Sequence, residues 1–333
     1  MALPEAPFSI QSQVRAPWRR YLDGLAPLRP DLHRYCCRLT GNLWDGEDLA
    51  QDTLVRVFGL LGKIDADLEN PRAYLIRTAT HLWIDQMRRR SRERSVMAGE
   101  RVEPSPAQPI HDPSRGTELR EATGEFFQRL APRERAAILL KEVFDLSLEE
   151  TASILKTTVG AVKAALHRGR SRLEETGASQ IPRDTPPSRE LVERFVKALT
   201  AKDLEALRTL CSEDLTVELV GGAELETFEG SRGFFEHAHM VLPQLGFGEN
   251  PHWEAIVYQG DPVVLGFRTL GGVEGINEVH RLEEVEGRIA RIRCYCFCPD
   301  TLRLLAEELS LKALRRPYRS PSPGQPMAKL ADV

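Results

Sequence analysis

The chain has 333 residues, enough for two or three domains of ordinary size. Hydrophobic residues make up 41% of it and charged residues 28%, values that exclude a largely disordered chain. The formal net charge of -4 excludes a uniformly basic protein, so any nucleic-acid binding has to come from a local basic region. No apolar run approaches the ~18 residues of a membrane span, and the N-terminal sequence MALPEAPFSI lacks the layout of a signal peptide. We therefore expect a cytoplasmic protein.

Composition divides the chain into three structured segments joined by two polar linkers and followed by a polar tail. The first two segments show helical periodicity, whereas helical and strand-like runs alternate in the third. The linkers are rich in Pro, Ser and charge, and the tail is expected to be disordered. The predicted boundaries are 18–94, 95–116 (linker), 117–175, 176–189 (linker), 190–314 and 315–333 (tail). We predict a multidomain protein in which two all-α domains, the second a helix-turn-helix, precede an α+β domain.

The first segment contains a helix with a polar outer face. We expect Asp45 to cap this helix, because Glu47 and Asp48 then fall in its first turn and an apolar repeat follows from Leu49 to Leu61. At ~100° per residue, the face opposite that repeat carries Asp48, Gln51 and Asp52. Such a face is either simply solvated or available to a protein partner.

The next helix of this segment carries a basic stripe. We expect Asn70 to cap it, with Pro71 at its first position, and the helix to run to about Arg94. The helix is apolar around most of its circumference, so the remaining stripe is narrow. The stripe and its C-terminal end carry Arg77, His81, Arg88, Arg89 and Arg92. Arginines at helical spacing favour phosphate contact, although the helix dipole also favours arginine at a solvated C-terminal end.

Residues 147–174 have the pattern of a helix-turn-helix. Ser147 and Glu150 form a capping box before a short helix that ends at Leu155, and a polar turn leads into a second helix from Val159 to about Glu174. The outward face of the second helix carries Ala161, Lys163, Ala164, His167, Arg168 and Arg172. A helix with one docked face and one small cationic face is typical of recognition helices that enter the major groove.

Residues 190–314 are predicted to form an α+β cone. Two short helices precede a mostly antiparallel set of five strand-like runs, and one further helix follows the first run. The expected strands are 215–220, 253–258, 263–269, 277–283 and 289–297. A curled sheet of this kind can enclose a pocket for isomerase or hydrolase chemistry, and its polar candidates are Tyr258, Asp261, His280 and Tyr295. We expect contact with a ligand or protein instead of catalysis, because fold alone is a weak argument for an activity.

The six cysteines are expected to be reduced, because they form neither a disulfide framework nor C-x-x-C pairs. Three of them, Cys294, Cys296 and Cys298, alternate along the last predicted strand and would share one face. Three thiols on one face suggest a metal or redox site, but consecutive alternate positions of a strand fit poorly around a tetrahedral ion. We therefore interpret these cysteines as small buried apolar residues and predict no metal and no cofactor.

Three stretches of the helical segments resemble the extracytoplasmic-function (ECF) sigma factors of the sigma-70 family, in the family's order. The stretch that resembles region 2.1 to 2.2 is LHRYCCRLTGNLWDGEDLAQDTLVRVF. The stretch that resembles region 2.3 to 2.4 is AYLIRTATHLWIDQMRRR. The stretch that resembles region 4 is LAPRERAAILLKEVFDLSLEETASILKTTVGAVKAALHRGRSRLEE. The resemblance implies a factor that binds RNA polymerase core and directs it to double-stranded promoter DNA, at the -10 element through region 2 and at the -35 element through region 4. It implies that Asp48, Gln51 and Asp52 form the polymerase-binding face.

The chain departs from the family pattern in two places. His81 stands where the family usually has Asn, which affects the -10 base preference. Ala161, Ala164 and Ala165 stand where the family commonly has Thr, Ser and Arg. Because alanine makes no polar base contact, -35 recognition would rest more on Lys163, Arg168 and backbone geometry.

The third segment resembles the SnoaL-like, NTF2-like domains that extend some ECF sigma factors. An Asn-Pro-Asp-Lys-Leu motif of those factors is partly matched by Cys298-Pro299-Asp300-Thr301-Leu302. The resemblance implies a regulatory role for Pro299 and Asp300, and we expect Asp300 to cap the helix that follows. Two other functions stay open at this point: a helix-turn-helix regulator that does not bind polymerase, and an NTF2-like isomerase or hydrolase fused to a DNA-binding module. The acidic face at Asp48 and Asp52 argues against the first, because a simple regulator has no need of it.

Overall fold

The computed structural model divides into two compact units, Met1–Ile181 and Pro182–Val333. Each unit has its own hydrophobic core. The described residues are 17, 20–61, 70–97, 130–174, 186–221, 224–240 and 249–314. Most of both predicted linkers and the predicted tail therefore lie outside the described residues.

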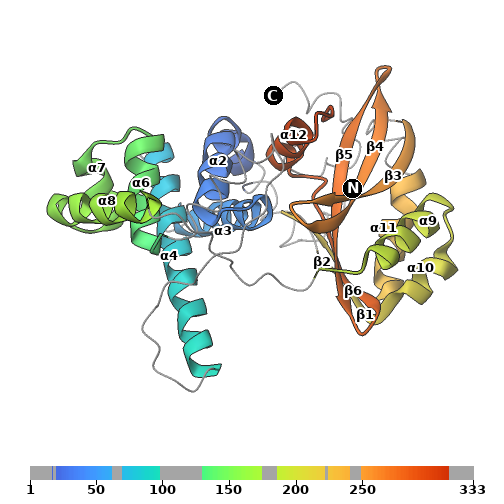
Figure 1. Ribbon diagram of the computed structural model, residues 1–333. Coiled ribbons are helices and arrows are strands. Elements are labelled where there is room, and N and C mark those ends of the chain that lie inside the picture. Colours follow the sequence, from blue (N-terminus) through green and yellow to red (C-terminus); the bar gives the residue numbers. More distant parts are fainter. Residues whose placement is uncertain are drawn as a thin grey trace, which may run out of the picture. The chain divides into compact units, whose positions relative to one another are not determined.

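The described residues of the first unit form helices and the turns between them (Figure 1). Its helices are η1 (Ala26–Leu28), α2 (Arg29–Thr40), α3 (Leu43–Leu61), α4 (Pro71–Met97), α6 (Pro132–Ile138), the π-helical turn η2 (Leu139–Val143), α7 (Leu148–Leu155) and α8 (Val159–Glu174). The side chain of Asn70 accepts from the backbone N–H of Ala73 (2.9 Å), as its predicted capping role requires. The prediction that Asp45 caps α3 was wrong. The side chain of Asn42 accepts from the backbone N–H of Asp45 (2.7 Å), so the helix begins earlier and Asp45 lies within its first turn.

The helix-turn-helix has the predicted bounds. Ser147 Oγ accepts from the backbone N–H of Glu150 (3.0 Å) and the Glu150 carboxylate accepts from the Ser147 N–H (2.8 Å), which completes the capping box. Gly169 brings α8 close to α6, since a Cβ at this position would lie 2.6 Å from Cδ1 of Ile138. The recognition helix is therefore fixed against a supporting helix.

The second unit is a six-stranded sheet with helices packed on it (Figure 1). Its elements are α9 (Arg189–Thr200), α10 (Leu204–Leu210), β1 (Cys211–Leu219), β2 (Glu224–Glu226), α11 (Phe228–Met240), β3 (Glu249–Tyr258), β4 (Asp261–Leu270), β5 (Val273–Val285), β6 (Arg288–Cys294) and α12 (Pro299–Glu308). The strand order is β2-β1-β6-β5-β4-β3, and of the neighbouring strand pairs only β1 and β6 run parallel. The helix α9 packs on β3 and β4, and α11 packs on β1. The predicted α+β architecture is confirmed.

The last strand ends sooner than the sequence predicted. Residues 289–297 were expected to form one strand, but β6 ends at Cys294. Cys296 lies in a turn and Cys298 is the N-cap residue of α12. The three cysteines therefore do not alternate along one strand face, although all three are buried.

Candidate nucleic-acid interface

The outward side of α8 is basic and made of small side chains. Val162 and Leu166 are buried and face the supporting helices. The exposed positions are Ala161, Lys163, Ala164, His167, Arg168 and Arg172, as the sequence predicted. Ala165 is buried (6% exposed), so only two of the three alanines reach the outer face. A small, cationic and firmly supported helix face fits the major groove of DNA.

Two arginines of this face are held by one buried carboxylate. Nε of Arg168 donates to Oε1 of Glu134 (2.9 Å), and Nη1 of Arg172 donates to Oε2 (2.6 Å). The Glu134 side chain is 5% exposed, whereas those of Arg168 and Arg172 are 58% and 46% exposed. The two guanidinium groups are thus oriented by α6 and still reach solvent. This anchoring role was not predicted, because Glu134 looks in the sequence like an ordinary acid in the first turn of α6.

The C-terminal half of the basic stripe on α4 is exposed. The side chains of Arg88 and Arg89 are 51% and 80% exposed, and Arg92 is exposed as well. Arg88 pairs with Asp85 (3.3 Å) and Arg89 with Glu93 (2.9 Å) on the same helix. Exposed pairs of this kind contribute little stability, so both arginines can exchange them for phosphate contacts.

The N-terminal half of the stripe is covered by α7. Nη2 of Arg77 donates to Oγ of Ser153 (3.2 Å), and Nε2 of His81 lies 2.7 Å from the carbonyl oxygen of Ile154. Burial lowers the pKa of His81, and the nearby cations Lys156 and Arg77 lower it further, against the bond to Ile154. His81 is therefore mostly neutral at pH 7, and it donates from Nε2 to the Ile154 carbonyl. In this arrangement Arg77 and His81 contact the helix-turn-helix instead of a ligand.

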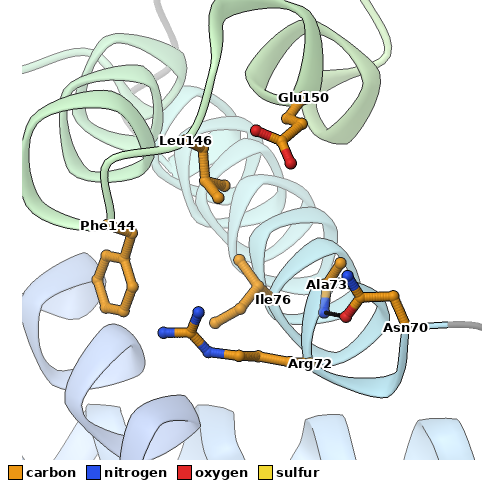
Figure 2. A pocket seen from close by; sticks show the side chains of 7 residues that line it. All are labelled: Asn70, Arg72, Ala73, Ile76, Phe144, Leu146 and Glu150. Atoms are coloured by element: carbon orange, nitrogen blue, oxygen red, sulfur yellow. Dashed lines mark hydrogen bonds between the residues drawn. The ribbon is translucent and has the colours of Figure 1, made fainter.

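Further contacts join α6, the helix that supports the helix-turn-helix, to α2 and α4. Nη1 of Arg135 donates to the carbonyls of Leu39 (2.9 Å) and Thr40 (3.3 Å) at the C-terminal end of α2, and its guanidinium lies 5.3 Å from the ring centre of Trp83. A cation is favourable at that end of a helix. Burial lowers the pKa of Arg135 to about 10, which leaves it charged at pH 7. Figure 2 shows a small groove in the same interface, where side chains of α4 face the segment before α7; it is lined by Asn70, Arg72, Ala73, Ile76, Phe144, Leu146 and Glu150.

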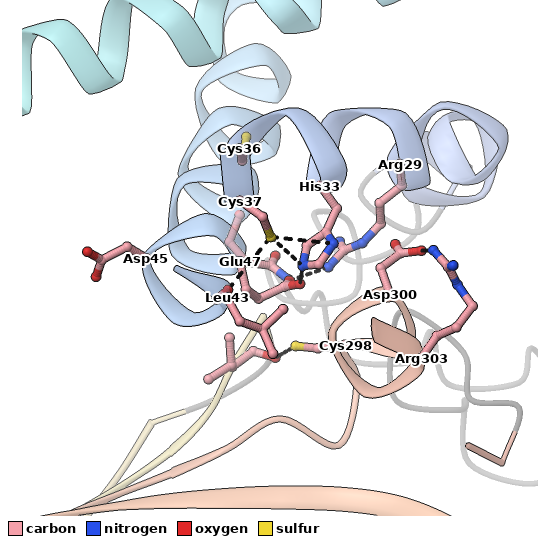
Figure 3. Close-up of polar contacts among 12 residues, drawn as sticks. Arg29, His33, Cys36, Cys37, Leu43, Asp45, Glu47, Cys298, Asp300 and Arg303 are labelled. Carbon is pink, nitrogen blue, oxygen red and sulfur yellow. Dashed lines mark hydrogen bonds and ion pairs between the residues drawn. The ribbon is translucent and has the colours of Figure 1, made fainter. Parts of the chain in front are cut away.

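The predicted polymerase face lies on α3, the helix that also carries Glu47. Figure 3 shows Glu47 in a buried ion cluster with Arg29 and His33. Asp52 is exposed and accepts from Nε2 of Gln86 (3.3 Å), and Asp48 is half-buried. Gln51 turns partly inward, where its Nε2 donates to Oε1 of Glu47 (2.6 Å). The fully buried Glu47 also pairs with Arg29 (2.5 Å) and His33 (3.2 Å). The geometry therefore leaves Asp48 and Asp52 as the main carboxylates of this face.

Glu47 is a residue whose role the sequence reasoning missed. It was expected to be an acid of the first helical turn, but its position is four residues after Leu43 and three before Ala50, on the apolar side of α3. Arg29 and His33, four residues apart on α2, supply the opposite charges. A carboxylate on an apolar stripe, opposite a basic i, i+4 pair, is the signal that could have identified it.

In the second unit, the prediction that Asp300 caps α12 was wrong. Cys298 is the N-cap residue and Pro299 occupies the first helical turn, where its missing N–H is not needed. Asp300 is buried (3% exposed) inside the first turn, and its carboxylate lies 3.7 Å from the guanidinium of Arg303 (Figure 3). Its negative charge is also favourable at a helix N-terminus.

The four polar side chains considered for catalysis are not brought together. The hydroxyl of Tyr258 donates to Glu308 (2.6 Å), and Asp261 pairs with Arg281 (3.6 Å) at the hairpin between β3 and β4. His280 lies within β5, next to Phe234. Tyr295 follows β6 and has Arg293 near its ring. No described helix is long and apolar enough to cross a membrane.

Family models match all three structured segments. Residues 26–93 match sigma-70 region 2, residues 120–173 match sigma-70 region 4, and residues 192–292 match a SnoaL-like domain. The chain is 27% identical to the ECF RNA polymerase sigma factor SigG of Mycobacterium tuberculosis, with 80% of this chain and 78% of that one covered. It is 32% identical to the RNA polymerase sigma-E factor of Streptomyces coelicolor, with 43% of this chain and 78% of that one covered.

The solved structures that the chain resembles include other sigma factors, with low TM-scores. The sigma factor RpoE of Bartonella quintana, in complex with the anti-sigma factor NepR, is 26% identical, covers 46% of this chain and 92% of its own, and has a TM-score of 0.36. The extracytoplasmic function sigma factor SigJ of Mycobacterium tuberculosis is 17% identical, covers 82% and 95%, and has a TM-score of 0.31. The family models and the curated relatives are the stronger of these findings.

Proposed function

Because this chain belongs to the ECF RNA polymerase sigma factor family, we propose that α8 contacts the -35 element of a promoter and that the exposed arginine end of α4 contacts the -10 element. The protein is an alternative sigma factor that directs RNA polymerase to promoters. The observation that carries the assignment is the outer face of α8, which is cationic and small and is held in place by Glu134.

The basic residues proposed to contact DNA are those whose side chains are exposed. Lys163 and His167 are exposed on α8, and Arg88, Arg89 and Arg92 are exposed on α4. Arg168 and Arg172 contact DNA and also form ion pairs with Glu134. Because the two flanking positions are Ala161 and Ala164, the helix approaches the groove closely and reads it through few polar side chains.

Arg77 and His81 join the promoter contact only after α7 moves away from α4. One nitrogen of each side chain is bonded to Ser153 or Ile154, so the region 2 stripe is half covered as long as the two regions are packed together. Binding to polymerase core would separate the regions and free both residues, since a ligand shifts a protein toward the state that it binds better.

Asp48, Gln51 and Asp52 are proposed to bind RNA polymerase core. Asp52 is exposed, and the buried charges of Arg29, His33 and Glu47 fix the helix on which all three residues lie. This face is the feature that a helix-turn-helix regulator without polymerase would not need. The factor would work where transcription takes place, in the cytoplasm.

The SnoaL-like domain is proposed to regulate the two sigma regions without catalysis. Tyr258, Asp261 and Tyr295 each contact a different charged residue, and His280 lies within β5 beside Phe234, so the four side chains give no geometric argument for an isomerase or hydrolase. The start of α12, with Pro299 and Asp300, is the proposed regulatory element, since Asp300 is a buried charge fixed within a helix turn. Its partner is a protein surface or a small ligand.

The test is the salt dependence of promoter binding by the polymerase holoenzyme. Lys163→Ala should lower the slope of log affinity against log salt by about one unit, because one phosphate contact is lost. Arg88→Ala with Arg89→Ala should lower it by about two. Lys197→Ala, which removes an equally exposed lysine from α9, is the matched control and should leave the slope unchanged. Promoter binding with the wild-type slope in both groups of variants would contradict the assignment.

A further inference from the structure

Three metal-binding types of side chain meet inside the sheet of the second unit. Glu278 and His280 are two residues apart on β5, so they share a face of the strand. Cys294 on β6 is the register partner of His280 and therefore lies beside it on the same face. One ligand atom from each residue can be chosen so that all lie within 4.8 Å of one another. All three residues are buried, at 3%, 2% and 1% exposed.

His280 is a buried imidazole without a hydrogen-bond partner among the described residues. Among the described residues, neither of its ring nitrogens makes a hydrogen bond, although Nε2 lies 3.5 Å from Oε1 of Glu278. The ring packs against Phe234 of α11, with the ring centres 5.8 Å apart. A buried imidazole whose nitrogens lack hydrogen bonds costs free energy, and a metal ion bound to one nitrogen would remove that cost.

The surroundings hold the carboxylate of the cluster in place. Nε1 of Trp253 donates to Oε1 of Glu278 (3.0 Å). Position 266 on the neighbouring strand β4 is glycine, and a Cβ there would lie 2.5 Å from the Glu278 side chain. An outer hydrogen bond that orients a ligand is a regular feature of protein metal sites. The buried guanidinium of Arg268, outside the cluster, interacts electrostatically with Glu278 and favours its ionised form.

We propose that Glu278, His280 and Cys294 bind a divalent metal ion of the zinc type. A thiolate, an imidazole and a carboxylate are the ligands that zinc prefers, and three protein ligands leave a fourth position for water or a small molecule. In a tetrahedral site with metal–ligand bonds of about 2.0–2.3 Å, ligand atoms are separated by ~3.3–3.8 Å. The distance of 3.5 Å between Nε2 of His280 and Oε1 of Glu278 falls within that range. Binding releases the proton of the Cys294 thiol to solvent.

This site is not the set of three cysteines at alternate positions of one strand, which fits poorly around a tetrahedral ion. The cluster uses Cys294 and takes its other two ligands from β5, across the register of the sheet. Cys294 is 14 residues from His280 and 16 from Glu278 in the sequence, so no local motif marks the three residues together.

Titration of the metal-free full-length protein with Co²⁺ tests the site, because cobalt reports its own ligands. The wild type should bind one equivalent, with a thiolate-to-cobalt band in the near ultraviolet and the intense visible bands of a tetrahedral ion. Zn²⁺ should displace it in equal amount. Cys294→Ser should abolish the thiolate band, and His280→Gln should weaken binding by at least about 100-fold, since even the loss of an orienting outer contact costs ~10–100-fold. Cys211→Ser is the matched control, because Cys211 is an equally buried cysteine of the same unit outside the cluster.

Circular dichroism of each variant separates loss of the ligand from loss of the fold. If Cys294→Ser or His280→Gln does not fold, Trp253→Phe provides the second test. It keeps an aromatic side chain but removes the N–H that donates to Glu278, and it should weaken Co²⁺ binding by about 10-fold or more. Failure of the folded wild type to bind stoichiometric Co²⁺ and Zn²⁺ would overturn the proposal. So would a thiolate band that persists in Cys294→Ser, or affinity that is unchanged in both folded His280→Gln and folded Trp253→Phe.

Discussion

Glu47 is the carboxylate on which the packing of α2 against α3 depends. It is fully buried and accepts from Arg29 and Gln51 while it pairs with His33. Removing one member of a buried ion cluster leaves an uncompensated charge, which typically costs about 3–5 kcal/mol. The cluster therefore fixes the helix that carries Asp48 and Asp52, so the polymerase face depends on residues that do not reach the surface.

The stability of the first unit should depend on pH through His33. Burial alone lowers the pKa of His33, but the nearby Cys37 and Glu47 outweigh it and raise the pKa to about 10. A raised pKa means that the stabilisation is complete below pH 6.5, the ordinary pKa of histidine, and is lost as the pH rises toward 10. Over that window the free energy of unfolding should fall by up to about 1.4 kcal/mol per pH unit.

Denaturant unfolding at a series of pH values measures this effect. His33→Gln should be less stable than the wild type near pH 6.5, and the difference should shrink as the pH approaches 10. His167→Gln, at an exposed position of α8, should keep the wild-type pH profile. A constant difference between His33→Gln and the wild type across this range would show that His33 is not charged in the folded protein.

Single residues were predicted best where the signal is local. The capping box of Ser147 and Glu150 and the cap at Asn70 need only neighbours in the sequence, and both are confirmed. The pairing of Glu134 with Arg168 spans 34 residues, and the cluster of His280 with Cys294 spans 14. Contacts of this range depend on how the elements pack, which no pattern within one element reveals.

At the scale of elements, the packing of α7 on α4 decides how much of the region 2 stripe is available. Arg77 and His81 are engaged by Ser153 and Ile154, and Arg135 adds a buried link to α2. The sequence predicted the stripe and the helix-turn-helix separately. It gave no reason to expect that one covers the other, because the connecting residues 98–129 carry no contact pattern.

Ser153→Trp should displace α7 from α4. Ser153 is exposed on α7, so the indole would disturb the contact with Arg77 without entering the core of the helix-turn-helix. The pKa of His81, now lowered mainly by burial, should rise toward 6.5 when the ring becomes solvated. Histidine resonances followed by NMR during a pH titration measure this. Ser171→Trp, at an exposed serine of α8, is the control, and an unchanged His81 pKa in Ser153→Trp would contradict the proposed cover.

Each predicted strand lies at its expected place in the chain, but β1, β3 and β5 each begin four residues earlier than predicted. Two further differences have a clear physical reason. The short edge strand β2 was not predicted, since three residues carry no usable periodicity. The last strand was predicted three residues too long, because its alternation continues past Cys294 into a turn. Pro299 fixes the start of α12 and Cys298 becomes its N-cap, so the chain leaves the sheet before the alternation ends.

At the scale of the whole molecule, two units with separate cores are joined by one linker of predominantly polar composition. Two domains joined by about 15 residues of chain have an effective concentration in the millimolar range, so even a weak contact between the units would be populated. Removing residues 186–333 should therefore change the rate of transcription initiation by about fivefold or more, as expected for a coupling of at least ~1 kcal/mol. Asp300→Ala should produce part of that change. Equal rates for the shortened and full-length proteins would contradict intramolecular regulation.

Transcription from a library of promoter fragments by purified core polymerase, with and without the full-length protein, tests the central claim most directly. A sigma factor with this region 2 and region 4 should produce new start sites at a subset of fragments that share a -10 and a -35 sequence. Using the Asp48→Lys and Asp52→Lys variant in place of the wild type should abolish these starts. A substitution at an exposed position such as Asp52 usually changes stability by less than about 0.5 kcal/mol, and circular dichroism checks the fold because Asp48 is half-buried. If the well-folded wild type yields no promoter-specific start above core alone, the account is contradicted.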